Sequence, residues 1–545
     1  MTRMPHLKSR TAAAALMFFL AATGPALPQG PQADLLIKGG TIYDGSEGNK
    51  GFTGDVAIAG DRILYVGPKA PMGARRTIDA RGKIVAPGFI DGHAHPATAA
   101  GDRNFTAEQD PAGRQLKGWL AQGASTIVVG VDGGSAGSGV GAPEVKTFFD
   151  QIRSQGFGTN IIAFVGYRAI RERVIGLENR PPTASELESE KALVAKAMCE
   201  GATGFSTGLF YFPQSYSKTD EIVTLAKEAA KRGGIYDSHQ RDEGSYSIGL
   251  VNSVKEALQI GEEAGLPVHI AHIKALGPDV WGKSADVIKL INEARAKGRS
   301  VTLDQYPYPA LMTGLEAAMV PRWAMNGGYP AMIKRFNEPA TLEKIRGEMR
   351  ENLRRQGGPH TVFFSQRGRP WTNKYLDEVA KEWKVEPVDA VIRILRQTER
   401  QAIIGFNMSE GDIATFMKQP YTATGSDGVD SHPRQYGTFP TKYQDYVRKK
   451  KVISLGQFIR SATGLPADIY MLDRRGYLKN GYYADVVVFD PVKYVAKADY
   501  YNWDRLSEGV IALAVNGKLA VDNGKLTVAL SGRPLPHTPT PGSCL

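Results

Sequence analysis

Cysteine is scarce in this chain: Cys199 and Cys544 are the only two in 545 residues. Two cysteines cannot build the disulfide framework that stabilises small secreted domains, and Cys544 lies in the C-terminal tail. We therefore expect two free thiols rather than a structural bridge. The fold should instead rest on a hydrophobic core, for which an apolar content of 42% is sufficient.

Long hydrophobic runs are also missing after the first thirty residues. The one apolar run, AAAALMFFLAA within residues 11–22, follows three basic residues and precedes small residues and prolines. This order is typical of a secretory signal, and the run is shorter than the roughly 20 residues that span a bilayer. We expect residues 1–30 to be a signal peptide, the mature protein to be periplasmic or secreted, and no stable membrane span. A retained membrane anchor is the alternative.

Clusters of Lys and Arg interleaved with aromatic residues are lacking as well. The net charge is +11, which favours an anionic substrate or an acidic surface. Without a basic and aromatic patch, however, we expect no nucleic-acid partner.

The two ends of the sequence share a pattern of short alternating strands and turns. Residues 31–83 and 466–545 both have it, and Val486–Phe489 reads as a buried strand. We expect one small β-sandwich built from both chain ends.

The middle of the chain, residues 84–465, alternates short apolar runs with helical segments. Eight such runs indicate an α/β fold, namely a (β/α)8 barrel of the TIM type. About 310–400 interrupts the last repeat, and we expect an insertion there, over the barrel mouth. The predicted barrel strands are Ile84–Ile90, Thr126–Gly130, Ile161–Tyr167, Thr203–Gly208, Gly234–His239, Val268–Ile273, Val301–Tyr306 and Tyr421–Asp427.

Four of the nine histidines lie at or just past the C-terminal ends of predicted strands, where TIM barrels place their active sites. His93 and His95 form an HxH pair whose side chains point the same way on an extended strand, so both can reach one metal ion. His239 and His272 each end a later strand. A packed, hydrogen-bonded histidine is the alternative for either one, and His269 is left unassigned.

A carboxylate completes the set. Asp427 ends the eighth predicted strand, where it can bind metal and accept a proton from water. Arg241, Asp242 and Glu243 follow His239 directly. They are candidates for orienting metal ligands or, equally, for a loop salt bridge.

In this order the residues resemble the amidohydrolase superfamily, and more specifically its D-aminoacylase (N-acyl-D-amino-acid deacylase) branch. The resemblance extends from about residue 34 to beyond 490. The matching segments are PGFIDGHAHP, GASTIVVG, GFSTGLFY, SHQRDEG, AHIKALG, DQYPY, TGSDG, HPRQYGTFP and RGYLKNGYYADVVVFDP.

The resemblance implies one or two zinc ions in the barrel and hydrolysis of an amide bond. It assigns the tightly bound zinc to His239 and His272 and a second position to His93 and His95. Asp427 matches the catalytic aspartate. The positions that match those holding the substrate carboxylate or the scissile carbonyl are Lys274, Tyr306 and Arg434.

One position departs from the family's pattern. After GASTIVVG the family typically has Asn-Cys-Gly, whose cysteine is a zinc ligand, whereas this chain has Val131-Asp132-Gly133. Asp132 is therefore a candidate carboxylate ligand. A turn residue in a glycine-rich loop is the alternative.

These observations predict a zinc-dependent hydrolase of small N-acyl amino acids, with N-acyl-D-amino acids favoured. An exported dipeptidase or a cyclic amidase of the same superfamily is an alternative. Cyclic amidases commonly carry a bridging carboxylated lysine after the third or fourth strand, and GATGFSTGLFY has none. A barrel protein that binds metal or ligand without catalysis is the alternative from another class.

Overall fold

The structure is a computed structural model that describes residues 1, 32–96, 113–134, 144–399 and 401–544. Apart from Met1, the predicted signal peptide lies outside the described residues. Within those ranges, no helix is both long and apolar enough to cross a membrane.

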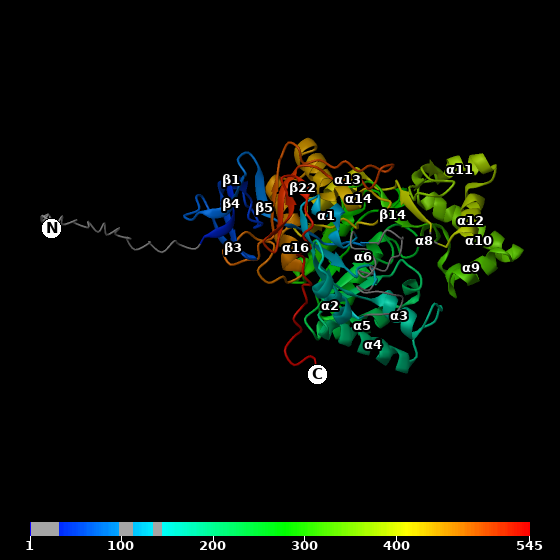
Figure 1. Ribbon diagram of the computed structural model, residues 1–545. Coiled ribbons are helices and arrows are strands. Elements are labelled where there is room, and N and C mark those ends of the chain that lie inside the picture. Colours follow the sequence, from blue (N-terminus) through cyan, green and yellow to red (C-terminus); the bar gives the residue numbers. More distant parts are fainter. Residues whose placement is uncertain (2–31, 97–112, 135–143, 400, 545) are drawn as a thin grey trace.

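A barrel of parallel strands forms the centre of the molecule (Figure 1). Each strand pairs in parallel with the next, and Gly92 N donates to Thr424 O at 3.0 Å, which brings the first and last strands together. The predicted fold class is confirmed. Over the described residues the strands are β6 (Phe89–Asp91), β7 (Ala124–Val129), β8 (Asn160–Ala163) with β9 (Val165–Gly166), β10 (Gly204–Gly208), β11 (Ile235–His239), β12 (Val268–Ile270), β13 (Val301–Gln305) and β18 (Thr422–Thr424).

Helices cover the outside of the barrel. The strands carry apolar side chains on both faces, and the outer face is buried by packing against these helices. Successive helices pack against one another around the outside. Helix α4 begins with a capping box in which Thr183 accepts from Glu186 N and Glu186 accepts from Thr183 N. The covering helices include α2 (Val145–Gln155), α3 (Tyr167–Val174), α4 (Ala184–Cys199), α5 (Thr219–Ala230), α6 (Leu250–Ala264), α7 (Ser284–Ala296), α13 (Glu410–Met417), α14 (Arg434–Thr441), α15 (Leu455–Ala462) and α16 (Gly464–Ile469).

The first predicted barrel strand, Ile84–Ile90, is two strands. β5 (Ile84–Pro87) belongs to the terminal sheet and only β6 belongs to the barrel. The chain changes sheets at Gly88, whose N donates to Asp485 O and where a Cβ would lie 2.4 Å from Ser125 Oγ. Only glycine permits that close approach.

Both chain ends contribute to one sheet, which has nine strands in the part of the chain that the structure describes. Apolar side chains from both ends share one core, Ile37 and Val56 packing with Val486 and Ala512. Val486–Phe489 is the buried strand predicted from the sequence. The strands are β1 (Ala33–Ile42), β2 (Phe52–Ala59), β3 (Arg62–Gly67), β4 (Ala74–Asp79), β5, β19 (Val486–Phe489), β20 (Val510–Val515), β21 (Lys518–Asp522) and β22 (Lys525–Leu526).

An inserted unit lies between β13 and β18 in the chain and on the side of the barrel away from the terminal sheet (Figure 1). It has its own hydrophobic core, which includes Leu315, Phe336, Trp371 and Ile394. Its elements are β14 (Leu311–Gly314), α8 (Leu315–Met319), α9 (Gly328–Phe336), α10 (Pro339–Arg355), β15 (Val362–Phe364), β16 (Lys374–Tyr375), α11 (Leu376–Trp383), α12 (Pro387–Gln397) and β17 (Ala402–Gly405).

The expectation of two free thiols is wrong, because Cys199 and Cys544 form a disulfide. The C-terminal tail is not loose. Backbone hydrogen bonds tie it to the barrel: Ile161 N donates to Arg533 O, Leu535 N to Ile161 O, and His537 N to Gly201 O. This path carries Cys544 to the C-terminal end of α4, where Cys199 lies.

Candidate metal centre

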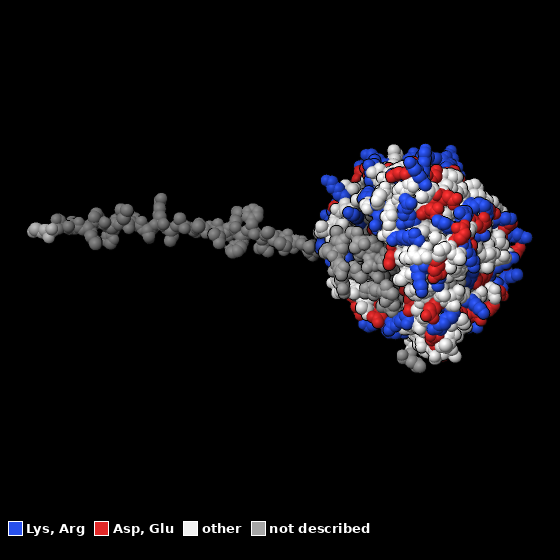
Figure 2. All heavy atoms as spheres, turned by 90° about the vertical axis from the view of Figure 1, so that its right-hand side faces the viewer, with Lys and Arg blue, Asp and Glu red and all other residues white. Residues whose placement is uncertain are grey.

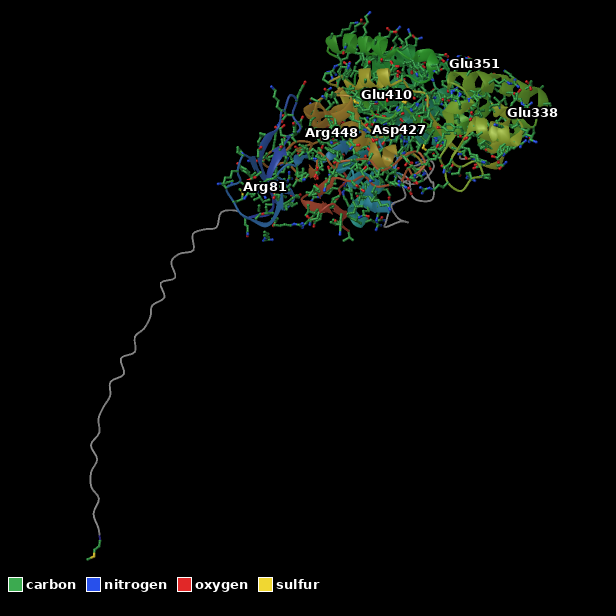
Figure 3. The ribbon with its side chains drawn as sticks, turned by 90° about the horizontal axis from the view of Figure 1, so that it is seen from above. Arg81, Glu338, Glu351, Glu410, Asp427 and Arg448 are labelled. Carbon is green, nitrogen blue, oxygen red and sulfur yellow. A yellow bond between two sulfur atoms is a disulfide. The ribbon has the colours of Figure 1, made fainter. Side chains whose placement is uncertain are left out.

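The candidate residues gather at the carboxyl ends of the barrel strands. His93 and His95 follow β6, Asp132 follows β7, His239 ends β11, His272 follows β12 and Asp427 follows β18. Asp427 is buried, and in Figure 3 it appears between Arg81, in the turn between β4 and β5, and Glu338, in the inserted unit. The fold therefore brings together side chains that are far apart in the sequence.

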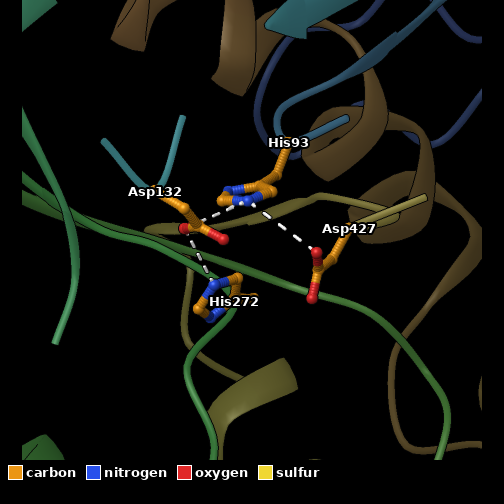
Figure 4. A group of neighbouring side chains, drawn as sticks. All are labelled: His93, Asp132, His272 and Asp427. Carbon is orange, nitrogen blue, oxygen red and sulfur yellow. Dashed lines mark hydrogen bonds and ion pairs between the residues drawn. The ribbon is translucent and has the colours of Figure 1, made fainter. Parts of the chain in front are cut away.

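The first group of metal-donor atoms comes from His93, His95, Asp132 and Asp427. Nε2 of His93 and Nε2 of His95 lie 3.1 Å apart. Nε2 of His95 lies 3.2 Å from Asp132 Oδ2 and 3.3 Å from Asp427 Oδ1. Nε2 of His93 lies 3.4 Å from Asp132 Oδ1. His272 lies beside this group as well: donor atoms of His93, Asp132, His272 and Asp427 all lie within 4.8 Å of one another, and Figure 4 shows these four side chains together.

The second group joins His239, His272 and the same Asp132. Nδ1 of His239 and Nε2 of His272 are 2.9 Å apart. Asp132 Oδ1 lies 3.1 Å from His272 Nε2, and Asp132 Oδ2 lies 3.7 Å from His239 Nδ1. Asp132 therefore stands between the two groups and contacts histidines of both.

These spacings fit a divalent cation. Ligands about 2.0–2.2 Å from a tetrahedral zinc lie roughly 3.4 Å from one another, close to the separations within each group. Burial opposes a charge on Asp427, yet Arg434 and His272 hold its pKa well below its usual range. Burial likewise opposes a charge on Asp132, and His93 and the other histidines lower its pKa well below normal. Two carboxylates in their anionic form, Asp427 buried and Asp132 partly exposed, lie among imidazoles and make a suitable donor set for zinc.

Three of the site residues have a left-handed backbone conformation. Asp132, His272 and Asp427 have φ angles of 55°, 32° and 47°, in the left-handed region that non-glycine residues rarely adopt. Each lies at or just past a strand end, where this turn of the backbone aims the side chain inward. The sequence left Asp132 as either a metal ligand or a turn residue. The structure shows it both in a turn and among the histidines, so the two roles are compatible. Such strain is often found at functional sites.

Glu243, which the sequence left open between two roles, contacts both histidines of the second group. Its Oε1 lies 3.1 Å from His272 Nδ1, and its Oε2 lies 3.7 Å from His239 Nε2. Burial opposes its ionisation, but Lys274 and the two histidines lower its pKa to about 2. The only sequence signal for this contact was its spacing, four residues after His239.

The two neighbours of Glu243 are structural. Arg241 forms an ion pair with Glu256 at 2.8 Å. Asp242 accepts hydrogen bonds from Gly244 N and Gly249 N and thereby shapes the loop. Of the two predicted roles, Arg241 therefore has that of a loop salt bridge, and Glu243 has that of a residue in contact with metal-donor histidines.

The three predicted substrate-binding residues lie beside the two donor groups. Lys274 Nζ is 2.6 Å from Glu243 Oε1 and 2.7 Å from His272 Nδ1. Arg434 Nη1 is 2.8 Å from Asp427 Oδ2. The ring of Tyr306 lies beneath both cations, 4.8 Å from Arg434 Cζ and 5.7 Å from Lys274 Nζ. Burial raises the pKa of Tyr306 well above normal, so its hydroxyl stays protonated.

His269, the unassigned histidine, lies outside both groups. Its Nε2 is 2.9 Å from Asp304 Oδ2 and its Nδ1 is 2.8 Å from Thr302 Oγ1. Asp304 Oδ1 in turn accepts from the backbone N of His272 at 3.1 Å. His269 is thus a packed, hydrogen-bonded histidine beneath the candidate metal centre.

The pattern of histidines and aspartates at strand ends has a counterpart in known proteins. A model of the amidohydrolase family matches residues 76–520, most of the chain. The chain belongs to the amidohydrolase family. Two curated relatives from Alcaligenes xylosoxydans xylosoxydans confirm the resemblance to the D-aminoacylase branch. A D-aminoacylase is 30% identical over 93% of this chain and 98% of its own length. An N-acyl-D-aspartate deacylase is 32% identical over 92% of this chain and 95% of its own.

A solved structure agrees with the sequence comparison. The N-acyl-D-glutamate deacylase of Bordetella bronchiseptica, in complex with zinc and a phosphonate mimic of the tetrahedral intermediate, superposes with a TM-score of 0.78 at 28% identity. The match covers 93% of this chain and all of that one. The shared fold therefore extends over most of this chain.

Proposed function

We propose that this amidohydrolase cleaves the amide bond of N-acyl-D-amino acids at a zinc centre. The observation that carries the proposal is the convergence of four histidines and two anionic carboxylates, with Asp132 shared between two donor groups. Relatives that act on N-acyl-D-amino acids over nearly the same length support the substrate class.

The residues that would hold the metal follow from the two groups. His239, His272 and Asp132 form one position, and His93, His95, Asp132 and Asp427 form the other. Zinc held there would polarise the amide carbonyl and make a bound water acidic. Asp132, a harder ligand than a thiolate, would tolerate hard divalent ions such as manganese as well.

Asp427 is the group that moves the proton. Its Oδ1 accepts a proton from the attacking water and then delivers it to the nitrogen of the leaving amino acid. The ion pair between its Oδ2 and Arg434 favours the anionic form at the start of the reaction. That contact also fixes the orientation of the carboxylate.

Lys274, Arg434 and Tyr306 surround the place for the rest of the substrate. Arg434 and Lys274 would hold the α-carboxylate, Arg434 through a two-pronged contact. Tyr306 would donate its hydroxyl proton to the oxygen of the amide carbonyl as negative charge develops there. Glu243 orients His272 and His239, as carboxylates commonly orient metal-binding histidines.

Export is part of the proposal. The sequence of residues 1–30 supports it, and so does the disulfide between Cys199 and Cys544, since disulfides persist in oxidising compartments. The mature enzyme would then act in the periplasm or outside the cell.

Hydrolysis assays with purified enzyme test the function. Zinc-loaded protein should release the amino acid from N-acetyl-D-methionine much faster than from its L enantiomer. Equal rates for the two enantiomers would contradict the stereochemistry. Hydrolysis of dipeptides or cyclic amides in place of all N-acyl amino acids would contradict the substrate class.

A further inference from the structure

A cleft of about 460 Å³ opens between the barrel and the inserted unit. Its barrel wall comes from the loops after β10 and β11, the edge at which such barrels bind substrates. Its other wall comes from residues 320–323 and from helix α10. Phe210 lies in this cleft, and its ring centroid is 5.8 Å from that of His239. The cleft and the metal centre therefore meet at one aromatic ring.

Most charged side chains that line the cleft already have partners. Arg241 pairs with Glu256, as described above, and Arg355 pairs with Glu351 at 3.3 Å. Glu348 accepts a hydrogen bond from Trp323 Nε1 at 2.9 Å. On the outer face of the inserted unit, basic and acidic side chains are likewise intermixed (Figure 2).

Arg322, which also lines the cleft, makes its hydrogen bonds to backbone carbonyls and not to a side chain. Its Nε donates to Phe210 O at 2.8 Å, and its Nη1 donates to Ala317 O at 2.8 Å and Val320 O at 3.3 Å. Its guanidinium carbon lies 4.2 Å from the centroid of the Phe210 ring. Among the described residues, no carboxylate pairs with this guanidinium and Nη2 has no hydrogen-bond partner.

This arrangement holds a cation in place without neutralising it. Backbone carbonyls and the face of an aromatic ring fix the guanidinium. Burial lowers its pKa, and Tyr246, Tyr211 and the nearby carboxylate of Glu316 oppose that shift only in part. A desolvated charge with no carboxylate in direct contact is costly, and a ligand anion that pairs with it would reduce that cost. A planar guanidinium with a free edge is well suited to a carboxylate.

We propose that Arg322 binds a second carboxylate of the substrate, so that the enzyme prefers N-acyl amino acids with a carboxylate beyond the α-carboxylate. The inference rests on the proposed function and narrows its substrate class. The α-carboxylate is assigned above to Arg434 and Lys274, beside Asp427 and His272. Arg322 instead contacts Phe210, whose ring centroid lies 5.8 Å from that of His239. The second carboxylate comes either from the amino-acid side chain or from a dicarboxylic acyl group.

Two matched pairs of substrates distinguish these sources. N-acetyl-D-glutamate and N-acetyl-D-glutamine differ only in side-chain charge. N-glutaryl-D-alanine and its terminal amide differ only in acyl charge. In one of the pairs, wild-type enzyme should prefer the acid by at least about tenfold in kcat/KM, the size expected for a charge-assisted contact.

The variant Arg322→Gln should bring the acid-to-amide ratio of that pair to about 1, mainly through KM for the acid. Arg322→Lys, which keeps the charge, should retain part of the preference. Arg350→Gln is the matched control, because Arg350 is exposed on α10 and pairs with Glu386 outside the cleft. Wild type without a preference in either pair, or an unchanged ratio in Arg322→Gln, would overturn the inference.

A binding measurement separates this inference from the proposed function. If neither these four substrates nor N-acetyl-D-methionine is hydrolysed, the proposed function fails, and calorimetry with glutarate as the probe decides the role of Arg322. Wild type should bind glutarate at least about tenfold more tightly than Arg322→Gln. Equal affinities of two proteins with the same melting temperature would show that Arg322 binds no carboxylate.

Discussion

The two ends of the barrel use their polar groups in opposite ways. At the carboxyl end, Asp132, His272 and Asp427 have strained backbones and place ionised or ionisable side chains against one another. At the amino end, the C-terminal tail satisfies backbone groups around Ile161, and a disulfide fastens the tail to α4. At the carboxyl end, the strained backbones and the closely placed donor side chains lower the stability of the fold, and a bound cation would offset that loss. At the amino end, the polar groups only stabilise the fold. Substitutions at the two ends should therefore separate activity from stability.

The largest effect on activity is expected from Asp427→Asn, which removes the proton acceptor at the carboxyl end. The amide cannot take a proton from water, so kcat should fall by roughly 10²–10⁴-fold while the protein stays folded and keeps most of its metal. Steady-state kinetics and metal analysis of the purified variant measure this.

Asp430→Asn is the control, because it alters a carboxyl in the same loop that contacts Gln435 and no metal donor. A rate for Asp427→Asn near that of wild type would mean that another group accepts the proton.

Asp132→Ala should weaken metal binding at both positions at once, since this carboxylate contacts histidines of both groups. Asp132→Cys should recover much of the zinc affinity but lose tolerance of manganese, because a thiolate is a softer ligand. Titration of the metal-free proteins with each ion tests both expectations. Unchanged affinity in Asp132→Ala would leave Asp132 as a turn residue.

A smaller loss is expected from Glu243→Gln. Without the carboxylate beside Nδ1, His272 is less well oriented, and zinc affinity should fall by about 10–100-fold. The readout is zinc affinity measured by competition with a chelator. Glu263→Gln, on the exposed face of α6, is the matched control. Equal affinities in the two variants would show that Glu243 does not position the histidines.

The smallest effect on kcat, and a clear effect on stability, is expected at the amino end. Cys199→Ser and Cys544→Ser should each lower the free energy of unfolding by about 2–4 kcal/mol, because the cross-link restricts the unfolded chain. Denaturant unfolding of both variants and of oxidised and reduced wild type measures this. A large loss of activity at unchanged stability would contradict the division of roles between the two ends.

The barrel could be predicted from the sequence because short apolar runs alternate with helical segments, and several of those runs end at or just before a candidate metal donor. His239 and Asp427 stand out for that reason. The division at Gly88 could not be predicted, since it depends on packing against Ser125 and Asp485.

The disulfide and the role of Glu243 could not be predicted from the sequence either, because both depend on the three-dimensional path of the chain. The path of the C-terminal tail depends on backbone hydrogen bonds to β8 and the end of α4, which leave no pattern in side-chain type. The spacing of Glu243 from His239 is compatible with a loop salt bridge, and only the fold brings it to His272. Arg322 became a candidate only once the inserted unit was placed against Phe210.

Metal dependence is the most direct test of the candidate centre. Zinc content is measured in the purified protein, together with hydrolysis of N-acetyl-D-methionine before chelation, after chelation and after zinc is restored. At least one zinc per chain is expected, with activity lost on chelation and recovered on reloading. Full activity in protein shown to be free of metal would contradict the assignment of His93, His95, Asp132, His239, His272 and Asp427 to a catalytic metal centre.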